Sequence, residues 1–215
     1  MITDFSKSKT ILNTFLRELR DVTIQDDSMR FRRNLERIGE IIAYEISKTL
    51  EYESLEINTP LAKSKANLPT EQPVIATILR AGLPLHNGVL NYFDKAENTF
   101  ISAYRKHGDQ NNFEVEIEYL ASPNIDGKTL ILCDPMLATG SSMVLAFKAI
   151  LEKGTPKKIH VVSVVASKTG IDFCLKNMPS EVDYWIGAID KTLDSKSYIV
   201  PGLGDAGDLA YGIKE

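Results

Sequence analysis

Short apolar runs alternate with helical patterns along most of the chain. The apolar runs are rich in β-branched residues and are bounded by polar ones, which is typical of buried strands. We expect strands at Val74–Leu79, Thr99–Tyr104, Thr129–Cys133, Ile159–Ala166 and Val182–Ile189. Apolar residues at helical spacing predict helices at Leu83–Tyr92, Ser142–Lys153 and Thr169–Asn177. This alternation favours a parallel sheet covered by helices on both faces, whose ligands bind beyond the carboxyl ends of the strands.

The stretch Phe31–Leu50 precedes this alternation and is predicted to be an amphipathic helix. Its apolar positions are Phe31, Leu35, Ile38, Ile42 and Ile46. Its polar side carries Arg32, Arg33 and Arg37. These arginines indicate either a solvated helix face or an interface or effector site.

Two other segments interrupt the pattern. Lys63–Pro73 is polar, carries two prolines, and is predicted to be a connection. Gly108–Asn112 is flanked by a stretch in which Val115, Ile117 and Tyr119 alternate with polar residues. This pattern predicts a hairpin arm with a flexible tip. Glu114, Glu116 and Glu118 would then face solvent.

Composition sets broad limits on function. The chain has 215 residues, 43 % hydrophobic and 25 % charged, which is typical of one globular domain. The net charge of −4 argues against a broad nucleic-acid-binding face but leaves room for a local cationic pocket. Met1–Lys9 lacks the apolar core of a signal peptide, and no run approaches the roughly 20 apolar residues of a membrane span. Cys133 and Cys174 match no zinc pattern, so we expect buried free thiols and a cytoplasmic location.

The loop Asp134–Ser142 follows the predicted strand Thr129–Cys133 and precedes a predicted helix. Gly140 lets the backbone approach a ligand or adopt a positive φ, and the amides at a helix N-terminus attract anions. Asp134 could accept hydrogen bonds from ribose hydroxyls while the amides of 139–142 hold a phosphate. The alternative is an ordinary capped helix after a strand that ends in aspartate. The chain contains no Gly-Lys-Ser/Thr, so this is not a Walker loop.

Two arginines directly follow predicted strands. Arg80 comes directly after Val74–Leu79, and Arg105 comes directly after Thr99–Tyr104, in Tyr-Arg-Lys-His. Each would lie at the same sheet edge as Asp134, where two guanidinium groups would suit a pyrophosphate. Taken singly, each arginine also fits a surface ion pair. Lys106 and His107 could extend the cationic field. For His107 alone, a solvated loop histidine is the simpler interpretation.

The last glycine-rich segment, Tyr198–Asp208, formally contains a dinucleotide fingerprint at Gly202–Gly207. The context rejects that assignment, because Pro201 interrupts the approach and only eight residues follow Gly207. The segment is stiff and has few side chains, so its backbone could complement the edge of a flat ligand. An unspecialised terminal loop is the alternative.

Three separated motifs together resemble the uracil phosphoribosyltransferase family. Asp-Pro-Met-Leu-Ala-Thr-Gly-Ser-Ser is similar to the family's loop for the donor phosphoribosyl pyrophosphate, with Ser141 where the family commonly has Gly. Leu-Arg-Ala-Gly and Tyr-Arg match its two arginine positions, and Tyr-Ile-Val-Pro-Gly-Leu-Gly-Asp-Ala-Gly-Asp matches its base-recognition segment. Cys133 precedes Asp134, so only one carboxylate is available where many phosphoribosyltransferases carry two.

The resemblance implies site residues. The donor would contact Arg80, Arg105, Asp134, Pro135, Met136, Leu137, Ala138, Thr139, Gly140, Ser141, Ser142 and Asp205. The uracil ring would contact Ile199, Gly204, Asp205 and Ala206. The catalytic groups would be Asp134, Arg105 and Asp205, and Mg²⁺ would arrive with the donor rather than on a set of protein ligands.

The resemblance also implies a type I phosphoribosyltransferase α/β fold, with a Rossmann-like parallel sheet, a flexible hairpin arm that covers the site, and a small hood from the termini. We expect a single domain over residues 1–215, with a core of about 70–190 and a hood from about 1–30 and 190–215. The expected reaction belongs to pyrimidine salvage and converts uracil and 5-phospho-α-D-ribose 1-diphosphate to UMP and diphosphate. A homo-oligomer and a GTP effector are further expectations, and neither nucleic acid nor membrane is an expected partner.

Three rival functions remain at this point. A transferase for a purine base would be expected to lack the Gly202–Asp208 signature. An RNA regulator with this fold would be favoured by a basic surface, which the acidic net charge disfavours. Asp134, Arg80 and Arg105 together weigh against a pseudoenzyme.

Overall fold

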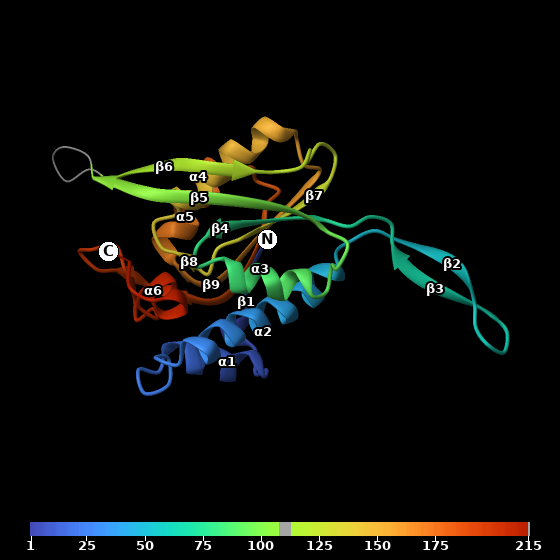
Figure 1. Cartoon of the computed structure of the whole chain (residues 1–215), viewed down its shortest axis with the longest axis horizontal. Helices are drawn as coiled ribbons and strands as arrows, with labels where there is room; N and C mark the ends of the chain where they lie inside the picture. The colour runs from blue at the N-terminus through green and yellow to red at the C-terminus, as the bar shows by residue number, and fades with distance from the viewer. Residues whose placement is uncertain (108–112, 215) are drawn as a thin grey trace.

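A central, mainly parallel sheet organises the computed structural model, which describes residues 1–107 and 113–214 (Figure 1). The side chains of 103–107 and 113–116 lie outside that description. The strand order is β1-β10-β9-β7-β4-β5-β6, and the short strand β8 also pairs with β9. All these neighbours run parallel except β5 and β6, which are antiparallel. The α/β fold with a parallel sheet is therefore confirmed.

The bounds of the elements agree closely with the apolar pattern in the central part of the chain. The strands of the sheet are β1 (Ile2–Asp4), β4 (Val74–Leu79), β5 (Glu97–His107), β6 (Phe113–Ala121), β7 (Thr129–Cys133), β8 (Met136–Leu137), β9 (Lys158–Ser167) and β10 (Asp183–Asp190). The helices are α1 (Leu12–Arg20), α2 (Ser28–Ser47), α3 (Leu83–Leu90), α4 (Ser141–Ile150), α5 (Lys168–Asn177) and α6 (Ala206–Tyr211), with 3-10 turns η1 (Phe5–Lys7) and η2 (Leu151–Lys153). Two small hairpins complete the list, β2 (Tyr52–Asn58) with β3 (Lys63–Pro69), and β11 (Thr192–Leu193) with β12 (Ile199–Val200).

Each face of the sheet has its own hydrophobic core. On β7, Ile131 and Cys133 pack toward α1, α2 and α3, whereas Leu130 and Leu132 pack toward α4 and α5. The strand is therefore buried on both faces, which explains its continuous apolar run. The predicted helix at Phe31–Leu50 is confirmed as α2, whose five predicted apolar positions are all buried.

Two antiparallel hairpins project from the body at opposite ends of the long axis (Figure 1). The predicted arm is confirmed as β5 and β6, while its predicted tip, 108–112, lies outside the described residues. Glu118 is exposed as predicted, and Glu114 and Glu116 lie among the side chains that are not described.

The second hairpin corrects one prediction. Lys63–Pro69 is not a bare connection but the strand β3, paired with β2 from Tyr52↔Pro69 to Asn58↔Lys63. The residues of β3 are mostly polar because the hairpin lies outside both hydrophobic cores. Hydrogen bonding to β2, not burial of an apolar run, therefore defines this strand.

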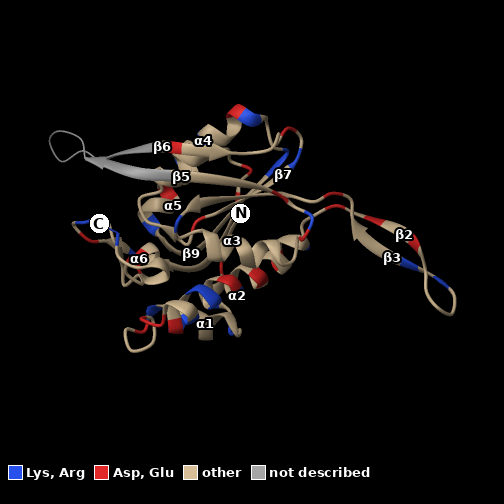
Figure 2. Ribbon diagram, in the orientation of Figure 1, with Lys and Arg blue, Asp and Glu red and all other residues tan. Residues whose placement is uncertain are grey.

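Positions of Lys and Arg and positions of Asp and Glu are interspersed along the described part of the chain (Figure 2). Both cysteines are buried and free, as predicted. None of the described helices has the length and apolar character that crossing a bilayer would need.

Candidate active site

A cavity of about 720 Å³ lies beyond the carboxyl ends of β4 and β7. It joins residues from the middle of the chain to residues near its end. Its polar lining consists of Arg80, Ser102, Asp134, Ser142, Lys196, Ser197, Tyr198, Asp205, Asp208 and Lys214, and its remaining lining of Ile78, Leu79, Ala81, Met136, Ala138, Ala206 and Gly207. The sequence prediction that chemistry gathers at this sheet edge is consistent with this placement.

Asp134 begins the loop after β7 and lines the cavity. Its backbone amide donates to the carbonyl of Val162 on the neighbouring strand, at 3.0 Å. Its Oδ1 accepts from the amide of Met136 at 3.3 Å. Burial nevertheless raises the pKa of the Asp134 carboxyl to about 7, because desolvation disfavours the charged form. A half-buried carboxyl that lines a hollow is suited to receive hydroxyl donors from a ligand.

The loop from Thr139 to Ser142 leads into α4 through a left-handed residue. Gly140 has a φ of +82°, and a Cβ atom there would lie 2.7 Å from the carbonyl oxygen of Gly170. Only glycine meets both conditions without strain. The helix begins at Ser141, and its N-cap residue Gly140 has no side chain that could cap it. The Thr139 hydroxyl accepts from the amide of Ser141 at 3.3 Å. The positive end of the α4 dipole points toward this loop, because the loop lies at the N-terminus of the helix.

Arg80 follows β4 and faces the end of the chain. Its Nη2 donates to Oδ1 of Asp208 at 3.1 Å and to the carbonyl of Gly212 at 3.3 Å. The backbone of Arg105 lies on β5 opposite Val115, and its side chain lies outside the described residues. The structure thus places Arg80 in the cavity and leaves the expected convergence of the two arginines a prediction.

The carboxyl-terminal segment supplies the opposite wall. Asp205 caps α6 by accepting from the amides of Gly207 and Asp208 at 2.8 and 3.1 Å. Asp205 and Ala206 line the cavity, and the amide of Ala206 lies 3.4 Å from the sulfur of Met136. Gly204 and Asp205 also line a neighbouring hollow of about 370 Å³. Ile199 is 3 % exposed, packs its side chain into the core and is not among the residues that line either hollow.

The comparisons with known proteins bear directly on this site. The family model described as "Uracil phosphoribosyltransferase" matches residues 6–213. The chain belongs to the uracil phosphoribosyltransferase family. A curated relative of that name from Porphyromonas gingivalis is 58 % identical over 205 residues, which cover 95 % of each chain.

Solved structures agree with the family fold. A protein from Aquifex aeolicus described as AQ2163 superposes with a TM-score of 0.88 at 31 % identity and covers 99 % of both chains. A hypoxanthine phosphoribosyltransferase from Staphylococcus aureus gives a TM-score of 0.50 at 12 % identity, covering 91 % of this chain and 93 % of that one. The second likeness shows a shared fold, that of type I phosphoribosyltransferases.

Several cavity residues of this family member had no role in the sequence prediction. Lys196 and Lys214 bring two further cations to the cavity, and Tyr198 brings an aromatic ring. Lys214 Nζ lies 3.7 Å from Oδ2 of Asp205. No local pattern marks these lysines. Lys196 lies between β11 and β12, and Lys214 follows Gly212, whose carbonyl accepts from Arg80.

Magnesium is the cofactor that the resemblance implies. Among residues 1–107 and 113–214, no group of three or more His, Cys, Asp or Glu side chains could hold a metal ion. Mg²⁺ is commonly held by one or two carboxylates together with substrate phosphates. The cavity offers such carboxylates in Asp134 and Asp205, so its residues fit an ion that enters with the donor.

Proposed function

We propose that this chain catalyses the reaction of uracil with 5-phospho-α-D-ribose 1-diphosphate to give UMP and diphosphate. The bond from the ribose C1 atom to the diphosphate oxygen breaks, the bond from C1 to N1 of uracil forms, and the N1 proton is released. The observation that carries this proposal is the single cavity that joins Arg80, the Asp134–Ser142 loop and Asp205–Ala206. These are the three motifs of the family, and they lie far apart in the sequence.

The donor would bind along the sheet edge. The amides of the loop and the first turn of α4 would hold the 5-phosphate, in the positive field of the helix N-terminus. The carboxylate of Asp134 would accept hydrogen bonds from the ribose hydroxyls. Arg80, with Arg105 from the arm, would meet the charge that develops on the diphosphate as it leaves.

The residues Pro135–Ala138 would complete the donor side of the cavity. Pro135 ties this stretch to β9, because its carbonyl accepts from the amides of Val164 and Val165 at 3.1 and 2.9 Å. Leu137 is buried in the core, so its side chain fixes the loop and only its backbone is available to a ligand. Positioning of the sugar would supply much of the rate, without a protein nucleophile.

The base would lie against the carboxyl-terminal wall. The backbone of Ile199 and Gly204–Ala206 would read the alternating acceptors and donor of the uracil edge. Asp205 would lie near both the base and the donor, because it lines the main cavity and the smaller hollow beside it. A transferase for a purine would need a different arrangement of this wall.

Magnesium would enter with the donor. Bound to the diphosphate, it would supply a positive charge that stabilises the leaving group. Asp134 and Asp205 are the residues available to orient it. The arm β5–β6 would then cover the site and exclude water, which matters because hydrolysis of the donor is the competing reaction.

The experiment is a base panel with the purified chain, the donor and Mg²⁺. Uracil, cytosine, hypoxanthine and guanine are each supplied, and mononucleotide formation is followed by chromatography. We expect UMP alone, and no product when Mg²⁺ is chelated. Faster reaction with hypoxanthine or guanine, or no UMP, would overturn the assignment. Adding GTP to the same assay tests the expected effector.

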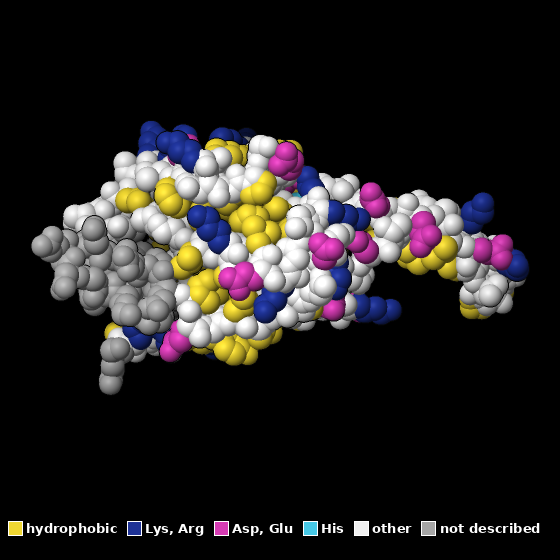
Figure 3. All heavy atoms as spheres, turned by 90° about the horizontal axis from the view of Figure 1, so that it is seen from above, with side chains coloured by type: hydrophobic (Ala, Val, Ile, Leu, Met, Phe, Trp, Pro, Cys, Tyr) yellow, Lys and Arg dark blue, Asp and Glu magenta, His cyan; other side chains and the backbone are white. Residues whose placement is uncertain are grey.

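We also propose that the chain acts as a homo-oligomer through the β2–β3 hairpin. One face of this hairpin carries Leu55, Ile57 and Leu68, which are 41 %, 39 % and 43 % exposed. Figure 3 shows hydrophobic side chains gathered on this projection. A lone two-stranded hairpin is marginally stable in water, so a second copy that covers the apolar face would stabilise it.

A further inference from the structure

The base-binding segment enters the cavity from a tight turn at Ile199–Gly202. Gly202 has a φ of +58°, and a Cβ atom there would lie 2.0 Å from the carbonyl oxygen of Ile199. The turn therefore requires glycine. Its amide donates to Oδ2 of Asp190 at 2.9 Å, so the start of the segment is fixed to the last residue of β10.

Asp190 is held in turn by an arginine from the other end of the chain. Arg20, the last residue of α1, donates from Nη2 to both carboxylate oxygens at 3.0 and 3.1 Å and from Nη1 to Oδ1 at 3.2 Å. Asp190 is only 8 % exposed, and a buried carboxylate is tolerated when it is paired and hydrogen-bonded. Its Oδ2 atom thus joins the guanidinium to the Gly202 amide.

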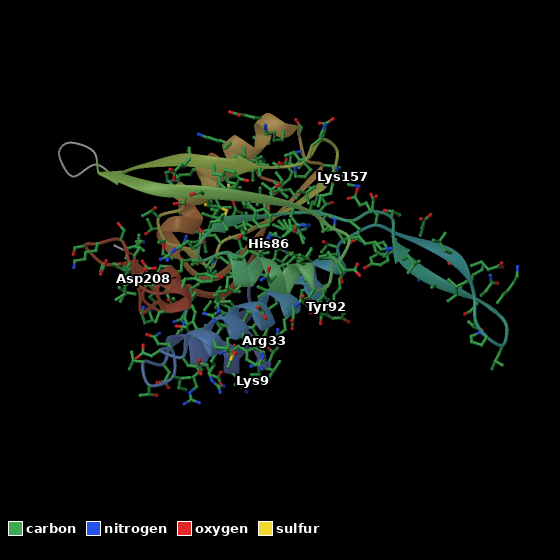
Figure 4. The ribbon with its side chains drawn as sticks, viewed as in Figure 1. Lys9, Arg33, His86, Tyr92, Lys157 and Asp208 are labelled. Atoms are coloured by element: carbon green, nitrogen blue, oxygen red, sulfur yellow. The ribbon has the colours of Figure 1, made fainter. Side chains whose placement is uncertain are left out.

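The same N-terminal region holds the segment at two more points. Gln25 Nε2 donates to the carbonyls of Leu19 and Leu203, at 2.8 and 3.1 Å. Arg32 Nη1 donates to the carbonyl of Ala210 at 2.6 Å. Figure 1 shows α1 and α2 beside α6, and Figure 4 labels Asp208 on that last helix. The N-terminal helices therefore contact the base-binding segment at its start and beyond its end.

We propose that Arg20 and Asp190 are positioning residues that set the geometry of the base-binding segment, and so determine affinity for uracil rather than for the donor. This inference rests on the proposed function. Neither residue lines the cavity in the described part of the chain, so each acts through Gly202. The donor side of the cavity, built on Asp134 and the start of α4, shares no hydrogen bond with the pair among the described residues.

Steady-state kinetics test the proposal in Arg20→Ala and Asp190→Ala. We expect the KM for uracil to rise about tenfold or more in each, the cost of one lost charge-assisted hydrogen bond, with the KM for the donor within about twofold. The double variant should resemble the singles, because the two residues act as one unit. Asp190→Asn keeps an acceptor for the Gly202 amide and should lie between wild type and Asp190→Ala.

Asp183→Ala is the matched control. Asp183 is the first residue of β10, is also 8 % exposed, and pairs with Lys158 at 2.7 Å, but it lies at the amino end of the strand, away from the cavity. Its loss should lower the melting temperature and leave both KM values unchanged. Equal rises in the two KM values, or an unchanged KM for uracil in folded Asp190→Ala, would overturn the positioning role.

Hydrogen exchange separates this inference from the proposed function. We expect the amides of Gly202–Asp208 to exchange faster in Arg20→Ala than in wild type, and at the wild-type rate in Asp183→Ala. This readout needs no turnover. If the wild-type chain made no UMP while the exchange rates followed this pattern, the substrate assignment would fall and the anchoring would stand. Unchanged exchange in Arg20→Ala would sink the anchoring itself.

Discussion

The guanidinium Nη2 of Arg80 lies 3.1 Å from Oδ1 of Asp208, across 128 residues of sequence. The contact joins the arginine proposed to meet the diphosphate to α6, whose first three residues belong to the base-binding segment. The side chains are 44 % and 27 % exposed, and such a partly exposed pair is worth little in stability. Arg80 can therefore exchange this carboxylate for a donor phosphate at small cost.

Arg80→Ala should raise the KM for the donor by about ten- to a hundredfold, because it removes a charge-assisted hydrogen bond to phosphate. Asp208→Asn removes only the resting partner of Arg80, so its KM for the donor should stay within about fivefold of wild type. Initial rates with the donor varied and uracil saturating measure both. Equal losses in the two variants would mean that the ion pair itself is required.

Activity should fall as the pH drops below about 7. In the proposed function Asp134 accepts ribose hydroxyls as a carboxylate. Burial raises its pKa to about 7, so acid protonates it within the physiological range. We expect kcat/KM for the donor to follow this ionisation. The donor's own phosphates also titrate, so Asp134→Asn serves as the control. The pH profile of kcat/KM for this variant should lack the step caused by Asp134 and keep any step caused by the donor.

The stability of Asp134→Asn relative to wild type should also increase as the pH rises. The folded protein binds the proton on Asp134 more tightly than the unfolded chain does, so stability from this group is lost as the pH rises from about 4 to about 7. The amide cannot ionise and escapes this loss. The melting temperature of the variant relative to wild type should therefore increase from pH 5 to pH 8, while turnover falls.

Sequence reasoning located most of the sheet and the edge of the cavity that carries Arg80 and Asp134. Val74–Leu79 and Thr129–Cys133 were predicted to the residue, because fully buried strands are continuous apolar runs bounded by polar residues. Asp134 and Arg80 could be placed because residues that follow parallel strands share one edge.

The other strands and the contacts near the chain ends depend on tertiary packing that no local sequence pattern encodes. The strand β3 was missed because a hairpin outside the core needs no apolar run, although the alternation of Leu55 and Ile57 on β2 was a usable signal. The strand β1 is three residues long and is defined by its pairing with β10. The approach of Arg20 to Asp190 follows only from the packing of the two ends of the chain together. The approach of Lys214 to Asp205 depends on how the chain turns back after α6.

The hairpin predicts a change of oligomeric state. Leu55→Lys places a charge on its apolar face, and light scattering after size exclusion should then show dissociation toward monomers. Glu56→Lys, on the opposite face where Glu56 pairs with Lys63 at 2.6 Å, is the control and should leave the mass unchanged. A wild-type chain that is already monomeric at micromolar concentration would contradict the proposed homo-oligomer.

The loop from Thr139 to Ser142 gives a stability prediction with a matched control. Gly140→Ala forces an alanine to a φ of +82° and places its Cβ atom 2.7 Å from the Gly170 carbonyl oxygen. Gly127→Ala imposes a similar φ of +67° with nothing within 4 Å of the new atom. Both variants should lose about 1–2 kcal/mol for the left-handed conformation, measured by urea unfolding. Gly140→Ala should lose more, and it alone should raise the KM for the donor, because relieving the clash moves the loop. Equal losses in the two variants would show that the contact with Gly170 costs nothing and that the loop can yield without displacing the donor site.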